Sequence, residues 1–550
     1  MTALSRSYHA GRRYPAQAAI AVALTGVMFF TFLFTVAALW ARCQLAWWIF
    51  PSAVLAAIVT ALATVPSAMR EGASLSVAAA TVIVVLAATG VAYFTVDSSF
   101  DGIYYHQEII AALCNGWNPF APPYDIIPPY TPWAVHYAKA VEISAAAIVS
   151  CTGAIETGKA INIIAVAALA ACVSTCLREQ GGRLAAHSRL LTAAAIANPV
   201  VCAQLLSYYI DFYKYVYLVW ALAAFIDIAA GRRRGTVILF MTLVLAMATK
   251  FNIFFEAGLW VAAAMVWWGV RGDGVALKCV TLTGVAALAV GCALTYHPYF
   301  TNWLQAGHPL YPLMGEGAED IMTGNTPAEF LGRSRFVTFF LSLLSVNLPS
   351  VAQPIGGFTP LMPLILILSL WSLWCLRGKI PGAMLYAAVQ VTVSCFFFEQ
   401  AWWARYICQL WLVPVIIVIA AFRAGGAAKA SRLTAWLMIA AGVSALLFTS
   451  KEMLVRGGYQ QLMLHTAASE PEVLVTGQWW GPQFERHMDE AGIHYRYVTE
   501  MPDTTGRTVL YYYEQNDPLI IISADGADKI RKSLESLHFN YTRHEYHSAR

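Results

Sequence analysis

Two carboxylates and an imidazole stand close together where a long apolar segment ends. Asp97 and Asp101 are four residues apart, and His106 follows them in the same polar, aromatic and proline-rich stretch, residues 96–139. Ionisable groups at the mouth of a membrane helix are costly to place and indicate a functional site. A carboxylate held beside a bilayer can act as a general base for a water-side acceptor that attacks a membrane-side donor.

A second interpretation of Asp101 is structural. The segment DGIYYHQEII begins a predicted helix at Asp101, and aspartate is a favoured N-cap residue. Ile103, Ile110 and Leu113 share one face of this helix, as expected of a helix that lies on the membrane surface. Capping and general-base chemistry both remain open for Asp101 on the sequence alone.

Other charged and polar residues collect at the same ends of the predicted helices. Lys250 and Arg405 would suit a lipid phosphate, because arginine offers a bidentate fork and lysine a point charge. The alternative is that each is a snorkelling side chain that reaches the membrane surface. The further members of this set are Glu108, Asp211, Lys214, Glu256, His297 and Asn302.

The composition predicts a membrane protein. Hydrophobic residues make up 59% of the 550 residues, charged residues make up 12%, and the mean hydropathy is +0.58. A soluble chain of this length could not bury so much apolar surface. The net charge of +4 is too weak to indicate nucleic acid as a partner. The eleven cysteines show neither metal-ligand spacing nor a disulfide framework.

The apolar segments predict an all-α polytopic membrane domain over residues 1–450, with about thirteen spanning helices of roughly 20 residues each. Short cytoplasmic loops concentrate Lys and Arg, and this rule places the N-terminus in the cytoplasm. The loops 96–154 and 297–358 then lie on the extracytoplasmic side. The segment 134–152 is either a surface helix or part of a span, because two charged residues interrupt it. The predicted spans are residues 17–40, 46–66, 75–95, 155–177, 189–208, 213–230, 236–249, 252–270, 277–296, 360–376, 383–398, 405–422 and 433–450.

The tail, residues 451–550, has a different composition and predicts a small soluble α/β domain on the extracytoplasmic side. Three segments rich in β-branched and aromatic residues indicate strands. Two amphipathic segments indicate helices, the second of them opened by Asp525 as N-cap. The predicted strands are residues 473–477, 508–514 and 518–524, and the predicted helices are residues 482–492 and 525–539.

The predicted sidedness restricts the chemistry. Nucleotide-activated donors are made in the cytoplasm, so group transfer on the other side needs a substrate that is carried across on a lipid. Its phosphate must then be held at the membrane surface. The residues alone predict an outward-facing membrane enzyme that acts on a lipid-phosphate substrate.

Five short segments occur in a suggestive order on this one side of the membrane. They are DGIYYH (101–106), ANPVVCAQLLSYYID (197–211), ATK (248–250), YFTNWLQAGHPLYPL (299–313) and WARYICQLWLVP (403–414). Their order resembles the GT-C superfamily of polytopic membrane glycosyltransferases, in particular its bacterial branch of protein mannosyltransferases and aminoarabinose transferases. One departure is that the catalytic loop follows the third predicted span rather than the first. Either two helices precede the common core, or the first three spans are wrongly counted.

The resemblance implies inverting transfer of a hexose or pentose from a polyprenyl-phosphate donor to a glycan, lipid or protein acceptor. It implies Asp101 as the catalytic base, with Asp97 as a second candidate. It implies that His106 supports the acceptor or the developing charge. The residues implied to hold the donor phosphate are Lys250, Arg405 and Tyr406, and those implied to line the cavity or the acceptor site are Tyr105, Glu108, Asp211, Asn302 and His308.

The resemblance also bears on cofactors and on location. Some family members use a divalent metal at the catalytic carboxylate. We expect no required cofactor here, with a divalent ion at Asp97 and Asp101 as the alternative, because two carboxylates are few ligands for such an ion. The resemblance implies a bacterial inner-membrane protein whose partners are membrane lipids and a polyprenyl-phosphate sugar.

Two other classes of function remain open. A lipid-linked glycan ligase or polymerase would take a diphosphate-linked donor and would rely on basic residues more than on an aspartate base. A transporter or flippase of lipid-linked sugars would need charges along an internal path and repeat symmetry. The sequence shows neither of these last two features.

Overall fold

Most of the described chain is helical. The computed structural model describes residues 14–122, 132–318, 326–344, 346–351, 358–398, 400–425, 428–476, 482–500, 502–511, 519–526, 528–529, 532 and 546–548. The longer helices are α2 (Pro15–Trp40), α3 (Ile49–Thr64), α5 (Ser74–Tyr93), α6 (Gln107–Cys114), α8 (Ala140–Thr152), α9 (Ala160–Glu179), α11 (Ser188–Ile196), α12 (Pro199–Gln204), α13 (Tyr213–Ala229), α14 (Arg233–Thr249), α15 (Phe251–Arg271), α16 (Gly274–Leu294), α17 (Tyr296–Ala306), α18 (Arg335–Leu343), α19 (Met362–Cys375), α20 (Gly382–Cys395), α21 (Leu412–Ala424), α22 (Ala428–Ala467) and α23 (Pro482–Glu490). Shorter helical turns are α4 (Pro66–Arg70), η1 (Gly102–His106), α7 (Pro132–His136), η2 (Ile155–Lys159), α10 (Gly182–Ala186), η3 (Ala328–Phe330), η4 (Ala404–Tyr406) and η5 (Cys408–Trp411).

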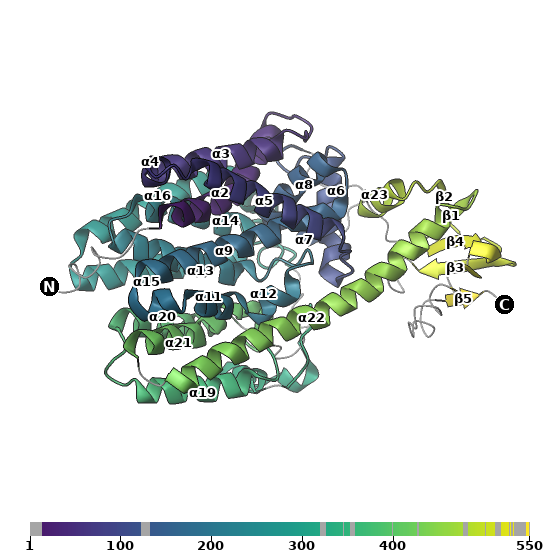
Figure 1. Ribbon diagram of the computed structural model, residues 1–550. Coiled ribbons are helices and arrows are strands. Elements are labelled where there is room, and N and C mark those ends of the chain that lie inside the picture. The colour runs from purple at the N-terminus through teal and green to yellow at the C-terminus, as the bar shows by residue number, and fades with distance from the viewer. Residues whose placement is uncertain are drawn as a thin grey trace.

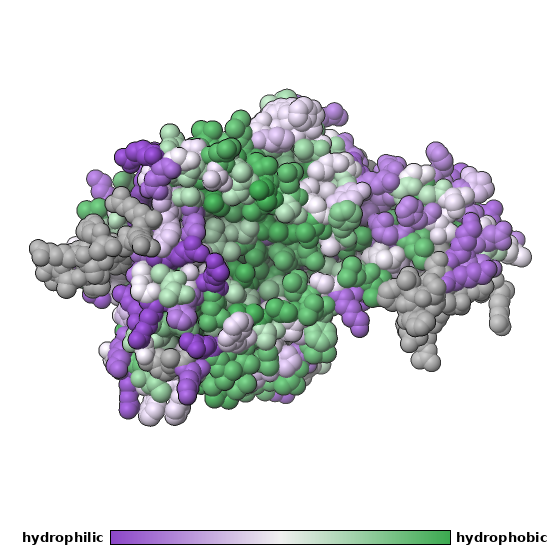
Figure 2. Space-filling model, viewed as in Figure 1, coloured by the Kyte–Doolittle hydropathy of each residue, from purple (hydrophilic) through white to green (hydrophobic). Residues whose placement is uncertain are grey.

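The helices form a bundle, and a small sheet lies beside one end of it (Figure 1). The long helix α22 runs from the bundle to the sheet. Among the described residues, six helices are long and apolar enough to cross a membrane, namely α2, α5, η2 with α9, α15, α16 and α22. Figure 2 shows an apolar band across the visible face of the bundle, with hydrophilic residues toward both ends. These features are those of a helical membrane protein with a C-terminal sheet region.

The helices coincide in sequence with the segments predicted as spans, but they do not confirm thirteen crossings. Besides the six long helices, five shorter apolar ones have 10–17 residues. The predicted span 189–208 is wrong as one helix, because α11 ends at Ile196 and the side chain of Asn198 caps α12 by accepting from the N–H of Val200. The expected boundary at residue 450 falls inside α22, which continues to Ala467.

Helix α2 lies at the centre of the bundle. It contacts α3, α5, α8, α9 and α14, and it is buried along most of its length. Small residues permit this close approach, since a Cβ on Gly26 would lie 3.1 Å from the Cβ of Ala57 in α3. Thr25, Thr31 and Thr35 donate hydrogen bonds to carbonyls four residues earlier. These bonds satisfy hydroxyls that have no water around them.

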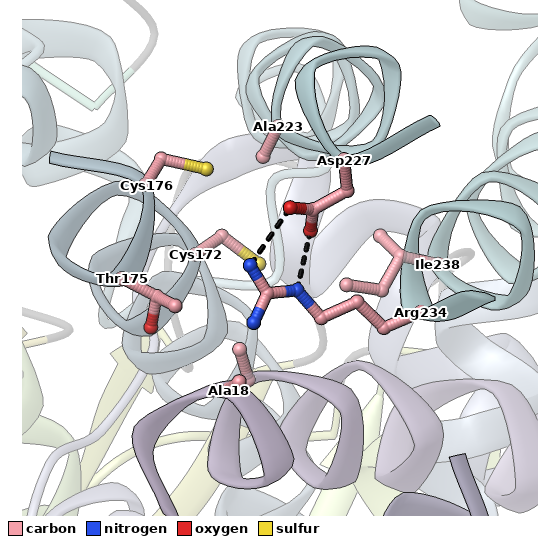
Figure 3. A pocket seen from close by; sticks show the side chains of 9 residues that line it. Ala18, Cys172, Thr175, Cys176, Ala223, Asp227, Arg234 and Ile238 are labelled. Carbon is pink, nitrogen blue, oxygen red and sulfur yellow. Dashed lines mark hydrogen bonds and ion pairs between the residues drawn. The ribbon is translucent and has the colours of Figure 1, made fainter. Parts of the chain in front are cut away.

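Ion pairs join one end of α9 to the neighbouring ends of α13 and α14. Arg234 donates from Nε and Nη2 to Asp227 at 2.6 and 2.7 Å (Figure 3), and from Nη1 to Glu179 at 3.0 Å. Arg232 binds the same two carboxylates at 2.9 and 2.5 Å. Beside them lies a cavity of about 10 Å³ whose lining includes Thr175, with room for about one water molecule. Two guanidinium groups facing two carboxylates carry no net charge, which makes their burial tolerable.

The described strands form a five-stranded sheet in the order β2-β1-β4-β3-β5. The first pair is parallel and the other three are antiparallel. The three predicted strands are confirmed as β1 (Val473–Thr476), β3 (Arg507–Tyr511) and β4 (Leu519–Ser523), and the first predicted helix is confirmed as α23. The sheet also contains β2 (Tyr495–Tyr497) and β5 (Tyr546–Ser548). Most of the second predicted helix, residues 525–539, lies outside the described residues.

Two helices that the sequence allowed at the membrane surface are buried instead. All residues of α6 except the last are buried, because α8 and α23 both contact it. The face formed by Ile103, Ile110 and Leu113 therefore meets protein, and the predicted surface helix is wrong. Helix α8 is buried from Ala140 to Val149, so the surface-helix alternative for its segment is also wrong.

The contact between α13 and α14 predicts a sensitive position at Gly235. A Cβ there would lie 2.6 Å from the carbonyl oxygen of Ala224 and 2.8 Å from the Cβ of Asp227. Gly235→Ala should push the two helices apart and lower the free energy of unfolding by about 1–3 kcal/mol. Gly258→Ala in α15 is the matched control, because a Cβ there meets nothing within 4 Å. Thermal unfolding in detergent measures both, and equal melting temperatures would contradict this packing.

Candidate functional site

Four charged side chains alternate in sign at the end of the bundle that carries η1 and α6 (Figure 1). Lys250 Nζ donates to Asp211 Oδ1 at 2.6 Å. Arg405 lies between two carboxylates, with Nη1 at 3.0 Å from Asp101 Oδ2 and at 3.6 Å from Asp211 Oδ2. The order Asp101, Arg405, Asp211, Lys250 is continuous, and we call these four residues the ion chain.

Each member of the ion chain lies at a helix end or in a turn. Asp101 precedes η1, and Arg405 lies in the turn η4. Asp211 lies just before α13, and Lys250 lies just after α14. Because α13 and α14 are consecutive, antiparallel neighbours, the start of one and the end of the other meet at the same level. The fold thereby brings together residues that are up to 304 positions apart in the sequence.

Burial makes the charges of the ion chain depend on one another. Taken as whole residues, Asp211 is 3% exposed and Arg405 is 8% exposed. Burial alone would raise the pKa of Asp211, but Lys250 and Arg405 outweigh this effect and hold its pKa below the ordinary value. Burial alone would lower the pKa of Lys250, but the carboxylate of Asp211 raises it. Asp211 and Lys250 are therefore both charged at neutral pH.

Aromatic rings surround the cations. The Cζ atom of Arg405 lies 3.9 Å from the ring centre of Trp403, 5.3 Å from that of Tyr209 and 5.5 Å from that of Tyr406. Lys250 Nζ lies 5.4 Å from the ring centre of Tyr406. Cation–π attraction is strongest for such desolvated cations. Within the described part of the chain, the buried Nε of Arg405 has no hydrogen-bond partner, so a donor is left for an anionic ligand.

Hydrogen bonds to the backbone fix the turn that carries Arg405. Lys214 Nζ donates to the carbonyl of Tyr406 at 2.6 Å. Asn198 Nδ2 donates to the carbonyl of Cys408 at 2.9 Å. Neither Lys250 nor Arg405 has the solvent-directed position of a snorkelling side chain, because Arg405 is buried, Lys250 is half-buried, and both are held in ion pairs.

Asp101 is the most exposed member of the ion chain. Its side chain is 19% exposed, compared with 10% for Arg405 and 2% for Asp211. The interpretation as an N-cap is wrong, because Asp101 has helical dihedral angles and its side chain caps no helix. The following turn, η1, is π-helical, a geometry that is frequent at functional sites.

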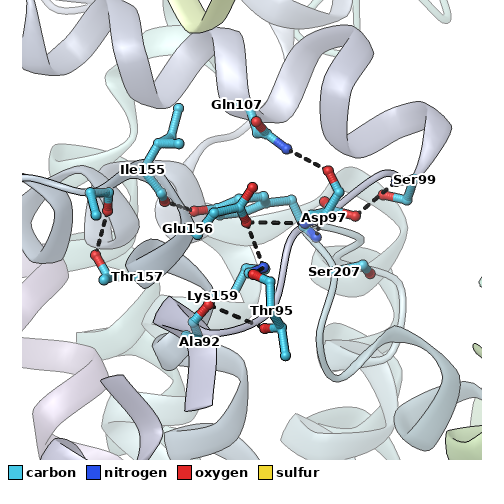
Figure 4. A network of polar contacts seen from close by, with 12 residues as sticks. Ala92, Thr95, Asp97, Ser99, Gln107, Ile155, Glu156, Thr157, Lys159 and Ser207 are labelled. Atoms are coloured by element: carbon cyan, nitrogen blue, oxygen red, sulfur yellow. Dashed lines mark hydrogen bonds and ion pairs between the residues drawn. The ribbon is translucent and has the colours of Figure 1, made fainter. Parts of the chain in front are cut away.

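Asp97 belongs to a different network (Figure 4). Its Oδ1 accepts from the N–H of Ser99 at 2.9 Å, and its Oδ2 accepts from the N–H of Tyr208 at 2.8 Å. Its own N–H donates to Glu156, which pairs with Lys159 at 2.5 Å. Burial raises the pKa of Asp97 to about 6, although Lys159 opposes the shift. Since backbone amides occupy both of its oxygens, Asp97 fits a structural role better than that of a base.

His106 is held by α8. Its Nδ1 lies 2.6 Å from Oε1 of Glu142, and its Nε2 has no hydrogen-bond partner among the described residues. Tyr105 lies against His106, with ring centres 4.1 Å apart. Burial, together with the carboxylates of Asp101 and Asp211, raises the pKa of Tyr105. Glu108 is buried in α6, where burial raises its pKa to about 9, so its carboxyl group is neutral at pH 7.

Asn302 and His308 hold the loop after α17. Asn302 Oδ1 lies 2.8 Å from Nδ1 of His136, and its Nδ2 donates to the carbonyls of His136 and Tyr311 at 3.0 and 2.9 Å. His308 Nδ1 accepts from the N–H of Leu310 at 3.1 Å. Asn302 thereby joins α17 to the end of α7, 166 positions earlier in the sequence. The described contacts give both residues a part in loop structure and do not join them to the ion chain.

Several residues that support the site were missed by the sequence prediction. Glu156 and Lys159 stand at the start of a predicted span, where the rule that selected Asp97 could have found them. Gln204 and Trp403 lie within two of the five quoted segments, but they were given no role, because amides and aromatic rings within apolar runs are common. The missed residues are Glu142, Glu156, Lys159, Gln204, Tyr209 and Trp403.

The residues at the site fit a divalent metal poorly. Among the described residues, no group of three or more His, Cys, Asp or Glu side chains is placed to hold a metal ion. Both oxygens of Asp97 accept backbone N–H groups, and Asp101 faces the guanidinium group of Arg405. A hard cation needs about six oxygen ligands. We therefore derive no step through a metal at this carboxylate pair.

Comparison of the chain with known protein families, with curated proteins and with solved structures found no match. The resemblance to GT-C glycosyltransferases thus rests on the five sequence segments. Four of these segments each supply one member of the ion chain, namely DGIYYH, ANPVVCAQLLSYYID, ATK and WARYICQLWLVP.

The alternating charges predict that Asp211 cannot be neutralised alone. Asp211→Asn leaves two buried cations without their shared carboxylate and should cost about 3–5 kcal/mol of unfolding free energy. The double variant Asp211→Asn with Lys250→Met should recover part of this loss, because the two residues are coupled. Asp503→Asn, at an exposed position of the C-terminal region, is the control. Thermal unfolding is the measurement, and a double variant whose loss equals the sum of the single losses would contradict the coupling.

Proposed function

We propose that the protein is an integral-membrane glycosyltransferase that moves a sugar from a polyprenyl-phosphate donor to an acceptor on the extracytoplasmic face. The observation that carries the proposal is the ion chain, which holds two buried cations and a partly exposed carboxylate in mutual contact. The cations match the phosphate of a lipid-linked donor. The carboxylate matches the proton that must leave the acceptor.

The proposed sidedness follows from the two ends of α13. This helix of 17 residues separates Asp211 from the buried network around Asp227 by about 25 Å, at 1.5 Å per residue. Basic residues concentrate at the Asp227 end, which by the positive-inside rule faces the cytoplasm. The ion chain then faces the opposite side. The basic residues at the Asp227 end include Arg178, Arg183, Arg232, Arg233, Arg234, Arg271, Lys278, Arg377 and Lys379.

In the proposed complex, the donor phosphate binds between Lys250 and Arg405. Both cations have carboxylate partners in the structure, so phosphate binding is an exchange of one anion for another. Arg405 also has its unused Nε donor, which lets it take a new ligand without losing every existing contact. The two cations would stabilise the charge that develops on the departing phosphate. The apolar prenyl chain stays among the lipids.

The proposed reaction is a single displacement with inversion. The acceptor oxygen forms a bond to the anomeric carbon while the bond from that carbon to the phosphate oxygen breaks. Polyprenyl phosphate leaves with the electron pair, and Asp101 takes the acceptor proton. In the structure, Oδ2 of Asp101 accepts a hydrogen bond from Nη1 of Arg405. A phosphate that draws Arg405 away would free this oxygen for the proton, so donor binding and activation of the base would be linked.

Residues beside Asp101 complete the proposed acceptor side. Tyr105 lies against His106, which pairs with Glu142, and the carboxylates of Asp101 and Asp211 raise the pKa of Tyr105. We assign Tyr105, His106 and Glu142 to support of the acceptor, because the free Nε2 of His106 and the phenol of Tyr105 can each make a hydrogen bond. By its resemblance to the bacterial branch, we place the protein in a bacterial inner membrane, with a glycan, a lipid or a protein as the acceptor.

Asp101→Asn tests the base. This change keeps the shape of the side chain, and it should lower sugar transfer by about 10²–10⁴-fold while polyprenyl phosphate still binds. Transfer is measured with purified protein and a panel of polyprenyl-monophosphate and polyprenyl-diphosphate sugars, with Asp503→Asn as the control. Full activity of Asp101→Asn, or use of diphosphate donors alone, would contradict the proposal.

Lys250→Met tests the donor phosphate site. Loss of a charge-assisted contact should weaken binding of polyprenyl phosphate by about 10–100-fold. Lys451→Met, which removes an exposed lysine from α22, is the matched control. Binding is measured as the ligand-dependent rise in melting temperature over a range of concentrations. An unchanged dissociation constant would place the phosphate elsewhere.

A further inference from the structure

The C-terminal region is docked against the bundle through α23. Arg486 Nη2 donates to the carbonyl of Gly153 at 2.7 Å, and Glu490 Oε1 accepts from the N–H of Ile155 at 2.9 Å. The third contact joins His487 Nε2 to Oε1 of Gln107 in α6 at 2.9 Å. These three bonds come from consecutive turns of one helix, and Figure 1 shows α23 beside α6.

The nitrogen and the oxygen of the Gln107 side-chain amide each make a hydrogen bond. Its Nε2 donates to the backbone carbonyl of Asp97 at 3.1 Å (Figure 4). A carbonyl only accepts, so the amide group faces Asp97 and its oxygen is left for His487. The ring of His487 must therefore donate through Nε2. Gln107 is 0% exposed and His487 is 4% exposed, so water does not compete for either bond.

The ring of His487 is suited to this single donor role. Burial lowers its pKa to about 4, with Glu490 opposing the shift and Lys159 and Arg486 adding to it. The imidazole is therefore neutral at pH 7. A neutral ring carries one N–H, and the bond to Gln107 fixes that hydrogen on Nε2.

Asp97 in turn contacts two segments that flank the pair formed by Asp101 and Arg405. Its side chain accepts from the N–H of Ser99, and the carbonyl of Ser99 accepts from the N–H of Ile103 at 3.0 Å. These bonds set the short loop that carries Asp101. Asp97 also accepts from the N–H of Tyr208, the residue before Tyr209. The ring of Tyr209 lies against Arg405.

We propose that His487 is a positioning residue, through which the C-terminal region holds the loop of Asp101 against Arg405. The path runs from His487 through Gln107 to Asp97, and from there to Asp101 on one side and Tyr209 on the other. This inference rests on the proposed function, since it gives Asp101 the role of base. Lys250 and its bond to Asp211 lie outside this path, whereas Arg405 lies at its end. We therefore expect kcat to fall by a larger factor than the affinity for polyprenyl phosphate.

The test compares two variants of His487. His487→Leu removes the donor to Gln107, whereas His487→Gln keeps an N–H donor at this position. Arg496→Ala, an exposed residue of the same region, is the control. Amide hydrogen exchange is followed at residues 97–103 and at Tyr208, together with kcat for transfer and the dissociation constant of polyprenyl phosphate.

For His487→Leu we expect exchange at these amides to rise at least tenfold and kcat to fall at least tenfold, while the dissociation constant rises by a smaller factor because Lys250 keeps its position. His487→Gln should restore most of both effects. Unchanged exchange at residues 97–103, or equal losses in both variants, would overturn the inference. Hydrogen exchange does not depend on activity, so a wild-type protein that transfers no sugar would refute the proposed function and leave the coupling to be decided by exchange.

Discussion

A guanidinium group held between two carboxylates is the interaction on which this site depends. Arg405 cannot be buried at 8% exposure without partners, because an unpaired buried charge is strongly destabilising. Asp101 and Asp211 supply these partners from segments that are far apart in the sequence. Lys250 balances the second carboxylate. The need to neutralise these charges therefore fixes the relative positions of the four segments that carry them. A change in one of the four charges alters the environment of the others.

Two ion networks lie at opposite ends of α13, and their differences indicate different roles. Around Asp227, two arginines saturate two carboxylates by several short bonds, which suits a structural lock. In the ion chain, Arg405 contacts Asp211 only at 3.6 Å, and its Nε has no hydrogen-bond partner among the residues that the structure describes. Asp101 is also partly exposed. A network that is incompletely satisfied and open at one member can exchange partners, which is what binding of an anionic substrate requires.

The sequence predicted most of the helices and singled out the residues of the ion chain. Long apolar runs indicate helices by length, and ionisable residues at their ends are rare enough to single out Asp101, Asp211, Lys250 and Arg405. The break before Pro199 was missed, although Asn-Pro is a turn signal. What could not be read was the difference between Asp97 and Asp101. Both are aspartates at the same helix mouth, and only the three-dimensional position of two backbone amides assigns the first to structure.

The burial of α6 was hidden for a similar reason. Its apolar face has the periodicity of a helix at a membrane surface, but it is covered by α23, whose His487 lies 380 residues away from its partner in α6. Periodicity shows that a face is apolar and does not show what covers it. Contacts of this range link the C-terminal region to the loop of Asp101, so the two parts of the chain have to be considered together.

The most direct test of the central claim is a cryo-EM structure of the protein in lipid nanodiscs with bound polyprenyl phosphate. We predict that the phosphate lies about 3 Å, hydrogen-bond distance, from both Lys250 Nζ and the guanidinium group of Arg405, with Oδ2 of Asp101 released from Arg405. A phosphate bound at the Asp227 end of α13, or one that leaves the ion chain unchanged, would contradict it.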